Sequence, residues 1–273
     1  MRAIGFVLHP THNEAATLYK EASDLLSNLG IRSYQQSDDF AAKHIEAVVS
    51  LGGDGTMLRA LQWAYDEGVP ALGINLGQMG YLSEVEPEEM IGALQLVVKG
   101  TYSLDERLAL RTEIATHQGI VSANAFNEVV VERETSGHVI RSDAYINDQF
   151  FLGYETDGLI VSTPTGSTAY NFSARGPILS PALEAIVLTP LSPHMLFDRS
   201  LILDSSHVLR FRIRTGPRAS VMIDGQVIAT LQPGDEVSVE RAERKIQLVK
   251  IADLPFYELV KRKFKLNGGL SDA

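Results

Sequence analysis

The spacing of apolar residues over the first hundred positions predicts strands and helices in alternation. Ala3–Leu8 is a short apolar run that ends at a His-Pro pair and is typical of a strand. Apolar residues then recur every three or four positions over Glu14–Leu29, which predicts an amphipathic helix that Asn13 caps and Gly30 ends. Further elements are expected as a strand at Ala47–Leu51, a helix at Met57–Glu67, a strand at Ala71–Asn75 and a helix at Pro87–Lys99. This alternation indicates an α/β domain with a parallel sheet.

From about Leu108 the pattern changes to short β-type segments with turn residues between them. Turn signals at Asn147-Asp148, Asp224-Gly225 and Pro233-Gly234 favour hairpins, so this region is expected to be mostly antiparallel. Strands are expected at Leu110–Thr116, Val129–Glu132, Ala144–Ile146, Leu159–Ser162, Val208–Ile213, Ser220–Ile223, Val237–Val239 and Ile246–Ile251. The predicted organisation is an α/β domain at 1–105, a β-rich domain at 106–252 and a helical tail at 253–273 that packs on the first domain.

Composition narrows the classes of protein to which this chain can belong. Of the 273 residues, 45% are hydrophobic and 21% are charged, which is ordinary for a globular protein. The formal net charge of −10 argues against a general affinity for nucleic acid or anionic membranes, but a local site can still bind an anionic small molecule. The absence of cysteine excludes disulfides and thiolate metal sites, and no run reaches the roughly 20 apolar residues that span a bilayer. The first residues resemble a strand rather than an export signal, so we expect a cytoplasmic protein.

A glycine-rich segment, Gly52-Gly53-Asp54-Gly55-Thr56, lies where a predicted strand ends and a helix begins. Glycines let the backbone approach phosphate oxygens, and a helix N-terminus offers unpaired N–H groups to an anion. Asp54 would repel phosphate, so its presence favours a proton acceptor or a group that helps hold Mg²⁺. The alternative is a tight turn in which Asp54 caps the helix. No Gly-Lys-Ser/Thr sequence follows, so the segment is not a Walker-type loop.

Two further polar segments interrupt the β-rich region. In Asp157–Tyr170 an apolar strand leads into a turn rich in hydroxyl groups, which can bond a polar ligand, and Tyr170 can pack on a flat base. The alternative is a Ser/Thr-rich turn that caps a helix. Asn127 and Glu128 form a polar pair between apolar stretches, which is costly to bury without partners. Ribose hydroxyls would be suitable partners, and a satisfied structural pair is the alternative.

Together these three segments resemble the NAD kinase family. Diacylglycerol kinases and 6-phosphofructokinases share the GGDG-type loop, so that element alone is only moderately specific. The stretches NEVVVER, DGLIVSTPTGSTAYNFSARGPIL and LTPLSPHML are more specific, and NLGQMGYL at Asn75–Leu82 is similar to a family loop. The resemblance extends from the first strand to the terminal FYELVKRKF segment.

The resemblance implies an N-terminal α/β domain and a C-terminal β-rich domain with the substrate between them. It implies transfer of the γ-phosphoryl group of ATP to the adenosine-ribose 2′-hydroxyl of NAD, which gives NADP. A divalent metal, Mg²⁺, would neutralise the phosphates, although the sequence does not assign its ligands. The implied partners are NAD and ATP, and the implied assembly is a homodimer or homotetramer.

The resemblance also implies roles for individual residues. Asp54 would be the proton acceptor, Gly55 would lie against the ligand and Arg59 would contact the dinucleotide. Asn127 and Glu128 would hold the ribose of the adenosine half. The remaining implied ligand contacts are Asp157 on the nicotinamide side, Thr165, Thr168, Ala169, Tyr170, Asn171, Phe172 and Ser173 around the adenine and neighbouring groups, and Gln226. The implied phosphate loop comprises Gly52, Gly53, Gly55 and Thr56.

The chain departs from the family at Glu155, where some members carry a basic residue. A carboxylate cannot bind phosphate, so a phosphate contact is not expected there. His138 and Arg141 lie near a region that touches ligand in some relatives, but we interpret them as residues of a surface strand. His194 is interpreted as a structural histidine.

Two other functions remain open at this stage. One is a kinase of another alcohol, such as a lipid or a sugar, and the Asp157–Tyr170 segment argues against it. The other is a non-catalytic regulator that binds NAD or NADP, against which the intact Asp54 argues.

Overall fold

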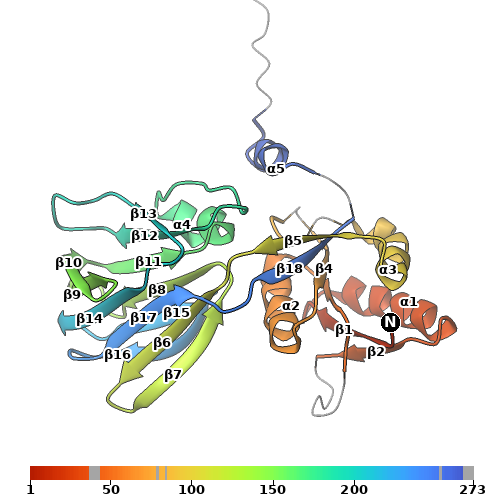
Figure 1. Cartoon of the computed structure of the whole chain (residues 1–273), viewed down its shortest axis with the longest axis horizontal. Helices are drawn as coiled ribbons and strands as arrows, with labels where there is room; N and C mark the ends of the chain where they lie inside the picture. The colour runs from red at the N-terminus through yellow and green to blue at the C-terminus, as the bar shows by residue number, and fades with distance from the viewer. Residues whose placement is uncertain (37–43, 78–79, 84, 252–253, 267–273) are drawn as a thin grey trace, which may run out of the picture. The chain divides into compact units, whose positions relative to one another are not determined.

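The chain divides into two compact units. The structure is a computed structural model that describes residues 1–36, 44–77, 80–83, 85–251 and 254–266. Unit 1 comprises Met1–Glu106 together with the chain from Ile246 onward, and unit 2 comprises Arg107–Lys245 (Figure 1). The last strand of the chain thus belongs to unit 1, whereas we had expected the β-rich domain to run to residue 252. Residues 253 and 267–273 of the predicted tail lie outside the described residues.

Unit 1 contains a six-stranded sheet in the order β2-β1-β3-β4-β18-β5. Strand β1 pairs in parallel with β2 and β3, and β4 pairs in parallel with β3 and β18. Its elements are β1 (Ala3–Leu8), α1 (Asn13–Asn28), β2 (Arg32–Gln35), β3 (Val48–Leu51), α2 (Asp54–Glu67), β4 (Ala71–Ile74), the 3₁₀ turn η1 (Pro87–Glu89), α3 (Met90–Lys99), β5 (Ser103–Arg107), β18 (Ile246–Lys250) and α5 (Phe256–Lys263). The predicted parallel α/β architecture is confirmed.

The apolar face of α1 buries Ala15, Leu18, Ala22 and Leu26 in one core with strands β1, β3 and β4 and helix α3. The predicted helix exists, but the predicted cap is wrong, because Asn13 is already helical and the N-cap is His12 without a side-chain bond. The ends of a helix cannot be placed from a sequence pattern to better than one or two residues, so the pattern does not distinguish an N-cap at His12 from one at Asn13.

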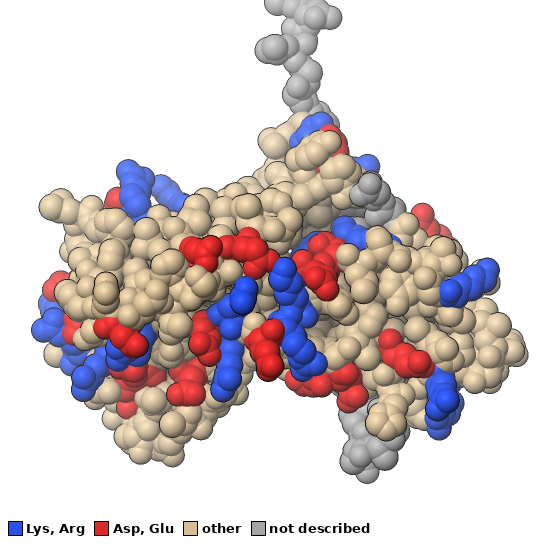
Figure 2. Space-filling model, in the orientation of Figure 1, with Lys and Arg blue, Asp and Glu red and all other residues tan. Residues whose placement is uncertain are grey.

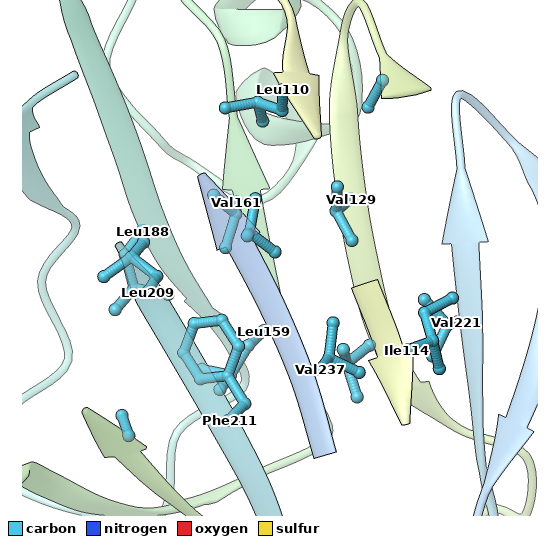
Figure 3. Packing of buried hydrophobic residues seen from close by; sticks show 14 of the residues in the cluster. Leu110, Ile114, Val129, Leu159, Val161, Leu188, Leu209, Phe211, Val221 and Val237 are labelled. Carbon is cyan, nitrogen blue, oxygen red and sulfur yellow. The ribbon is translucent and has the colours of Figure 1, made fainter. Parts of the chain in front are cut away.

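Unit 2 contains two six-stranded sheets, ordered β10-β9-β14-β17-β6-β7 and β13-β12-β11-β8-β15-β16. Residues from both sheets form one core, including Val129, Leu159, Phe211 and Val237 (Figure 3). Its elements are β6 (Leu110–Thr116), β7 (Gly119–Ala125), β8 (Glu128–Arg133), β9 (Ile140–Ile146), β10 (Gln149–Thr156), β11 (Gly158–Ser162), the 3₁₀ turn η2 (Thr165–Thr168), α4 (Tyr170–Ser173), β12 (Ala185–Leu191), β13 (Leu201–Asp204), β14 (Leu209–Thr215), β15 (Ala219–Ile223), β16 (Gln226–Leu231) and β17 (Glu236–Arg241). The predicted antiparallel, β-rich character is confirmed.

Two of the three predicted hairpin turns are present, whereas Pro233-Gly234 joins β16 and β17 of different sheets, and one strand assignment is wrong. Asn147 and Asp148 both have positive φ, as do Asp224 and Gly225, which matches the hairpin turns that such pairs favour. Ile246–Ile251 was expected among the antiparallel strands, but β18 pairs in parallel with β4. A short apolar run does not reveal its partner strand, so pattern alone could not assign it to unit 1.

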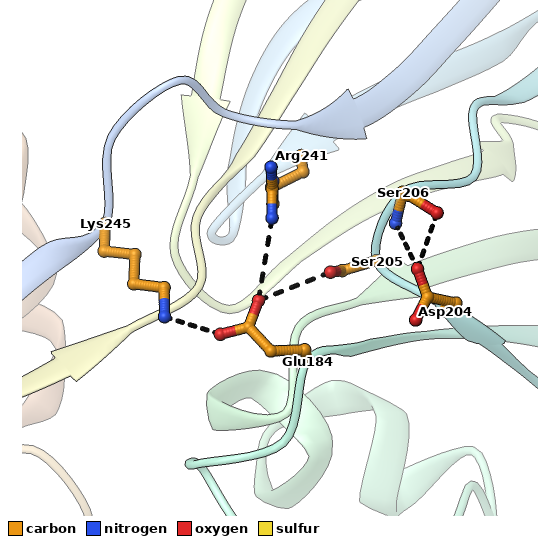
Figure 4. A network of polar contacts seen from close by, with 6 residues as sticks. All are labelled: Glu184, Asp204, Ser205, Ser206, Arg241 and Lys245. Atoms are coloured by element: carbon orange, nitrogen blue, oxygen red, sulfur yellow. Dashed lines mark hydrogen bonds and ion pairs between the residues drawn. The ribbon is translucent and has the colours of Figure 1, made fainter.

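Polar contacts stabilise the end of unit 2 near its last residue. The carboxylate of Glu184 accepts a bond from Lys245 Nζ at 2.5 Å, lies 3.8 Å from Arg241 Nη1 and accepts a bond from Ser205 Oγ at 3.4 Å (Figure 4). Lys245 is the main reason that the pKa of Glu184 is below its usual range. These contacts fix the chain where unit 2 ends and β18 of unit 1 follows.

Charged side chains of both signs are interspersed on the face drawn in Figure 2. On that face, lysine and arginine do not collect into one large basic area. Among the described residues, no helix has the length and apolar character needed to cross a bilayer.

Candidate active site

A cleft of about 480 Å³ lies in unit 1 at the carboxyl ends of the parallel strands. It is lined by His9, Pro10, Gly53, Gly55, Thr56, Arg59, Asn75, Leu76 and Gly77. These residues follow β1, β3 and β4 or begin α2, and open α/β sheets bind their ligands at this edge. The predicted phosphate loop therefore borders a cleft, although Gly52 itself is buried beneath it. A Cβ on Gly52 would lie 2.3 Å from Thr56 Oγ1, which explains the glycine.

Asp54 is the first residue of α2, but its carboxylate does not bond the helix. Oδ2 accepts the N–H of Tyr81 at 2.9 Å, and Oδ1 accepts the N–H of Leu82 at 3.1 Å. A Cβ on Gly80 would lie 1.9 Å from Asp54 Oδ1, so any residue other than glycine at this position would clash with the carboxylate. These contacts disfavour the helix-cap interpretation and place an oriented carboxylate beside the glycine loop.

Two polar side chains that line the cleft, those of Arg59 and Asn75, are hydrogen-bonded to the backbone. Arg59 Nη2 donates to the carbonyl of Leu8 at 2.7 Å, so the backbone orients this guanidinium. Asn75 is 1% exposed, and its Nδ2 donates to the carbonyl of Gly77 at 3.1 Å. Asn75 Oδ1 has no hydrogen-bond partner among the residues that the structure describes. Sequence reasoning noted the loop beginning at Asn75 but assigned no role to this residue, although its position directly after a strand could have indicated one.

Unit 2 brings the two other predicted segments together. Strand β8 lies between β11 and β15, with Glu128 opposite Ser162 and Val129 opposite Ile223. The start of β8 therefore lies beside the hydroxyl-rich turn that follows β11 and beside the Asp224-Gly225 turn. Gly166 packs directly on this segment, since a Cβ there would lie 2.1 Å from the carbonyl oxygen of Asn127.

Glu128 is the most perturbed acid of unit 2. It is 5% exposed, and its Oε2 has no hydrogen-bond partner among the described residues. Burial and, to a smaller extent, the nearby charge of Asp224 raise the pKa of Glu128 to about 8, although a bond from the N–H of Tyr170 partly opposes them. At neutral pH this carboxyl therefore keeps its proton and can both donate and accept a hydrogen bond. Thr165 Oγ1 is also buried without a partner in the described part of the chain.

Several predicted contacts have other partners or face solvent. Asn171 is fully buried, and its amide donates to the carbonyls of Ser167 and Pro177 and accepts from Thr189 Oγ1 at 2.6 Å. Its side chain is thus used within the fold. Tyr170, Phe172, Ser173 and Gln226 are exposed, and Thr168 and Ala169 are partly buried. Tyr170 Oη donates to Glu132 at 3.5 Å.

Asp157 lies in an ion pair. Arg133 donates to it from Nε at 2.7 Å and from Nη2 at 3.0 Å, and this arginine lowers the pKa of Asp157. Glu155 accepts from Arg141 Nε at 2.9 Å, in agreement with a surface strand rather than a phosphate site. His194 donates its backbone N–H to the carbonyl of Glu155.

A metal ion would find few protein ligands at either site. No group of three His, Cys, Asp or Glu side chains is close enough to hold a metal within the described ranges. Mg²⁺ usually keeps several waters and binds one or two protein oxygens together with phosphates. Asn75 Oδ1, which has no partner in the described part of the chain, and the carboxylate of Asp54 are oxygen donors of the kind that this mode of binding uses.

Comparisons with known proteins agree with this architecture. The family model for the ATP-NAD kinase N-terminal domain matches residues 31–102, and that for the ATP-NAD kinase C-terminal domain matches residues 126–251. An NAD kinase of Natranaerobius thermophilus is 37% identical over 260 residues, which is 94% of this chain and 89% of the relative. An NAD kinase of Moorella thermoacetica is 40% identical over 229 residues, which is 83% of this chain and 73% of the relative.

Solved structures show the same fold. Yeast NADH kinase, solved with NADH, has a TM-score of 0.89 at 24% identity and covers 100% of this chain and 90% of its own. An NAD kinase from Archaeoglobus fulgidus, solved with ATP, has a TM-score of 0.76 at 24% identity and covers 98% and 100%. The fold and the glycine-aspartate loop thus define a two-domain phosphotransferase. More specifically, the chain belongs to the ATP-NAD kinase family.

Proposed function

We propose that this protein transfers the γ-phosphoryl group of ATP to the adenosine-ribose 2′-hydroxyl of NAD and so makes NADP. The observation that carries the proposal is the Asp54 carboxylate, held by the amides of Tyr81 and Leu82 beside a glycine loop and a cleft. Family membership supplies the substrate class, since the matched relatives are named NAD kinases.

Asp54 is assigned the role of proton acceptor. Each of its oxygens accepts one backbone bond, which leaves a second lone pair on each to take the proton of a hydroxyl. The N-terminus of α2 and the amides of the glycine loop would face the donor phosphates, where negative charge is favoured. Positioning and electrostatics dominate phosphoryl transfer, because its transition state is loose.

The dinucleotide is assigned to the start of β8 and the turn after β11. Asn127 and the protonated Glu128 would bond ribose hydroxyls, and the free Thr165 Oγ1 would add a donor. The exposed face of Tyr170 would pack on a base. The assigned roles of Asp157, Gln226 and the exposed residues of α4 rest on the family resemblance.

A divalent cation, Mg²⁺, is proposed to arrive with the nucleotide. When bound it would neutralise the charge that develops on the phosphates. Asn75 Oδ1 and Asp54 are the protein oxygens that would hold it or its waters. We expect turnover to stop in excess chelator and to return when Mg²⁺ is added, and full turnover in chelator would contradict this assignment.

We also propose that the protein forms a homodimer or homotetramer and is located in the cytoplasm. Apolar side chains on the edge strands of unit 2 support an assembly, because Ile120 of β7, Ile202 of β13 and Val227 of β16 are each at least half exposed. Sedimentation equilibrium tests this directly, and a monomer at micromolar concentration would exclude it.

The activity is tested by incubating the protein with Mg-ATP and NAD and reading NADP with an NADP-specific dehydrogenase. Parallel reactions with a diacylglycerol and with a sugar test a kinase of another alcohol. NAD binding without turnover would indicate a non-catalytic regulator and overturn the proposal.

A further inference from the structure

Asp224 holds three consecutive backbone amides of the proposed ribose site. Its Oδ2 accepts the N–H of Phe126 at 2.9 Å, and its Oδ1 accepts the N–H groups of Asn127 at 2.8 Å and Glu128 at 3.1 Å. The backbone N–H of Asp224 in turn donates to the carbonyl of Glu128 at 3.1 Å. One residue, almost a hundred positions away in sequence, thus fixes the main chain on which both ribose-site side chains stand.

The carbonyl groups of the same segment are held by the turn after β11. Thr163 donates its N–H to the carbonyl of Asn127 at 2.9 Å and its Oγ1 to the carbonyl of Phe126 at 2.7 Å. The N–H of Gly166 donates to Thr163 Oγ1 at 2.9 Å. The three N–H groups of segment 126–128 are therefore held by the carboxylate of Asp224, and its first two carbonyls are held by Thr163.

The charges of this cluster are divided between two carboxyl groups. Burial raises the pKa of both Asp224 and Glu128, but three amide donors oppose the effect at Asp224. Because both oxygens of Asp224 accept N–H groups, we assign the negative charge to Asp224 and the proton to Glu128. The other titratable group that faces Glu128 is Tyr170, whose own charged neighbours include Glu132 and Asp157.

We propose that Asp224 is a positioning residue of the dinucleotide site, whose carboxylate sets the orientation of Asn127 and Glu128 toward the ribose. The inference rests on the proposed function, because it assumes that these two side chains meet NAD. Asp224 acts only through them and is not itself assigned a contact with the ligand.

The shape of the turn and the carboxylate can be tested separately. Asp224 has φ of 48°, a left-handed conformation that asparagine also adopts readily. Asp224→Asn therefore keeps the hairpin turn, but it removes the charge and presents an NH₂ group to at least one backbone N–H. A loss of NAD binding in this variant would show that binding requires the carboxylate and not only the shape of the turn.

Asp235 provides a matched control. It also lies in a turn of unit 2, between β16 and β17, is 7% exposed, and accepts the backbone N–H groups of His117 and Gln232 at 3.1 and 2.8 Å. It precedes β17, which belongs to the other sheet. Asp235→Asn thus repeats the chemical change away from the ribose cluster.

The experiment is calorimetric titration of NAD and, separately, of Mg-ATP into wild type, Asp224→Asn, Glu128→Ala, the double variant and Asp235→Asn. We expect Asp224→Asn to weaken NAD about tenfold and to leave Mg-ATP within about twofold, since one or two hydrogen bonds lose their geometry. Asp235→Asn should leave both unchanged. The double variant should weaken NAD by less than the product of the single effects, because Asp224 acts through Glu128.

Unchanged NAD affinity in Asp224→Asn, or a double variant whose effects multiply fully, would overturn the inference and leave the proposed function intact. Wild type that neither binds NAD nor makes NADP would overturn both. If Asp224→Asn does not fold, Thr163→Val removes the Oγ1 bond to the Phe126 carbonyl of the same segment and takes its place. Unchanged NAD affinity there would equally refute positioning of this segment.

Discussion

Asp54 of unit 1 and Glu128 of unit 2 are two carboxyl groups assigned to the ligands, and their surroundings are opposite. Asp54 of unit 1 is partly exposed beside a glycine loop, and both of its oxygens accept amide bonds. Glu128 of unit 2 is 5% exposed in a sheet, has one oxygen without a partner in the described residues, and has a pKa raised to about 8. The comparison teaches that surroundings, rather than residue type, separate a proton acceptor from a neutral group that bonds hydroxyls.

The place of each carboxyl group in its sheet explains the difference in surroundings. A parallel sheet ends its strands at one edge, where loops and a helix N-terminus leave room for charged ligands. The start of β8 instead lies between two antiparallel neighbours, so a carboxyl there is desolvated unless a ligand reaches it. We therefore expect changes at Asp54 to affect the rate and changes at Glu128 to affect binding.

The largest effect is expected for Asp54→Asn. Asparagine keeps the size but cannot take the proton, and loss of a general base costs about 10²–10⁴ in rate. A loose transition state needs less help from the base, so we expect kcat to fall about 10²–10³-fold with little change in KM for NAD. Asp66→Asn, near the end of the same helix, should leave kcat unchanged. A kcat of Asp54→Asn within about threefold of wild type would remove the base assignment.

The next largest effect is expected for Asn127→Ala and Glu128→Ala. Each lost bond to a buried partner costs about 1–3 kcal/mol, which is roughly a 5- to 150-fold rise in KM for NAD. KM for ATP should stay near its wild-type value, because the donor is assigned to unit 1. Steady-state kinetics with each substrate varied in turn measures both KM values. An equal rise in both would contradict the assignment of NAD to unit 2 and of ATP to unit 1.

A smaller effect on kcat is expected for Gly80→Ala. The added methyl group would lie 1.9 Å from Asp54 Oδ1, so the carboxylate must turn away. We expect kcat to fall about tenfold, as small displacements of a reacting group are costly. Gly92→Ala in α3 is the matched control, since a Cβ there meets nothing within 4 Å and alanine favours a helix. Equal activity of the two variants would show that the Gly80 contact does not orient Asp54.

The last effect is expected in stability rather than in activity and concerns Glu128→Gln. The folded protein holds the Glu128 proton up to about pH 8, whereas the unfolded chain releases it near 4.5, the ordinary pKa of a glutamate. The contribution of Glu128 is therefore complete below about pH 4.5 and declines as the pH rises toward 8. The melting temperature of Glu128→Gln, measured from pH 5 to 9, should rise progressively relative to that of wild type up to about pH 8. A difference that does not vary with pH would contradict the protonated state of Glu128.

Much of the fold could be predicted because its signals are local. The alternation of elements over 1–105 and the hairpin turns depend on nearby residues, so the pattern contains them. The pairing of β18 with β4 depends on a partner about 175 residues away, and the exposed strands β7 and β10 have few apolar residues facing a core. For these elements, sequence periodicity gives no direct information.

The candidate site could be predicted only where a motif contains it. The glycine loop and the Asn127-Glu128 pair were identified from residue type and spacing. Asp224 was visible only as a turn residue, because its three amide partners lie almost a hundred positions earlier. Asn171 lies in a motif and was expected at the ligand, yet the fold uses its amide internally. Sequence alone cannot tell which polar atoms are already bonded.

The most direct test of the division between the units is calorimetric titration of NAD into the Asp54→Asn variant in the presence of Mg²⁺ and a non-hydrolysable ATP analogue. The analogue prevents turnover, so NAD is not consumed during the titration. The account predicts a Kd for NAD within about threefold of the wild-type value, because the hydroxyl-bonding groups of unit 2 are unchanged. A Kd weakened tenfold or more, in a variant that melts like wild type, would show that Asp54 binds the dinucleotide in the ground state and would contradict the account.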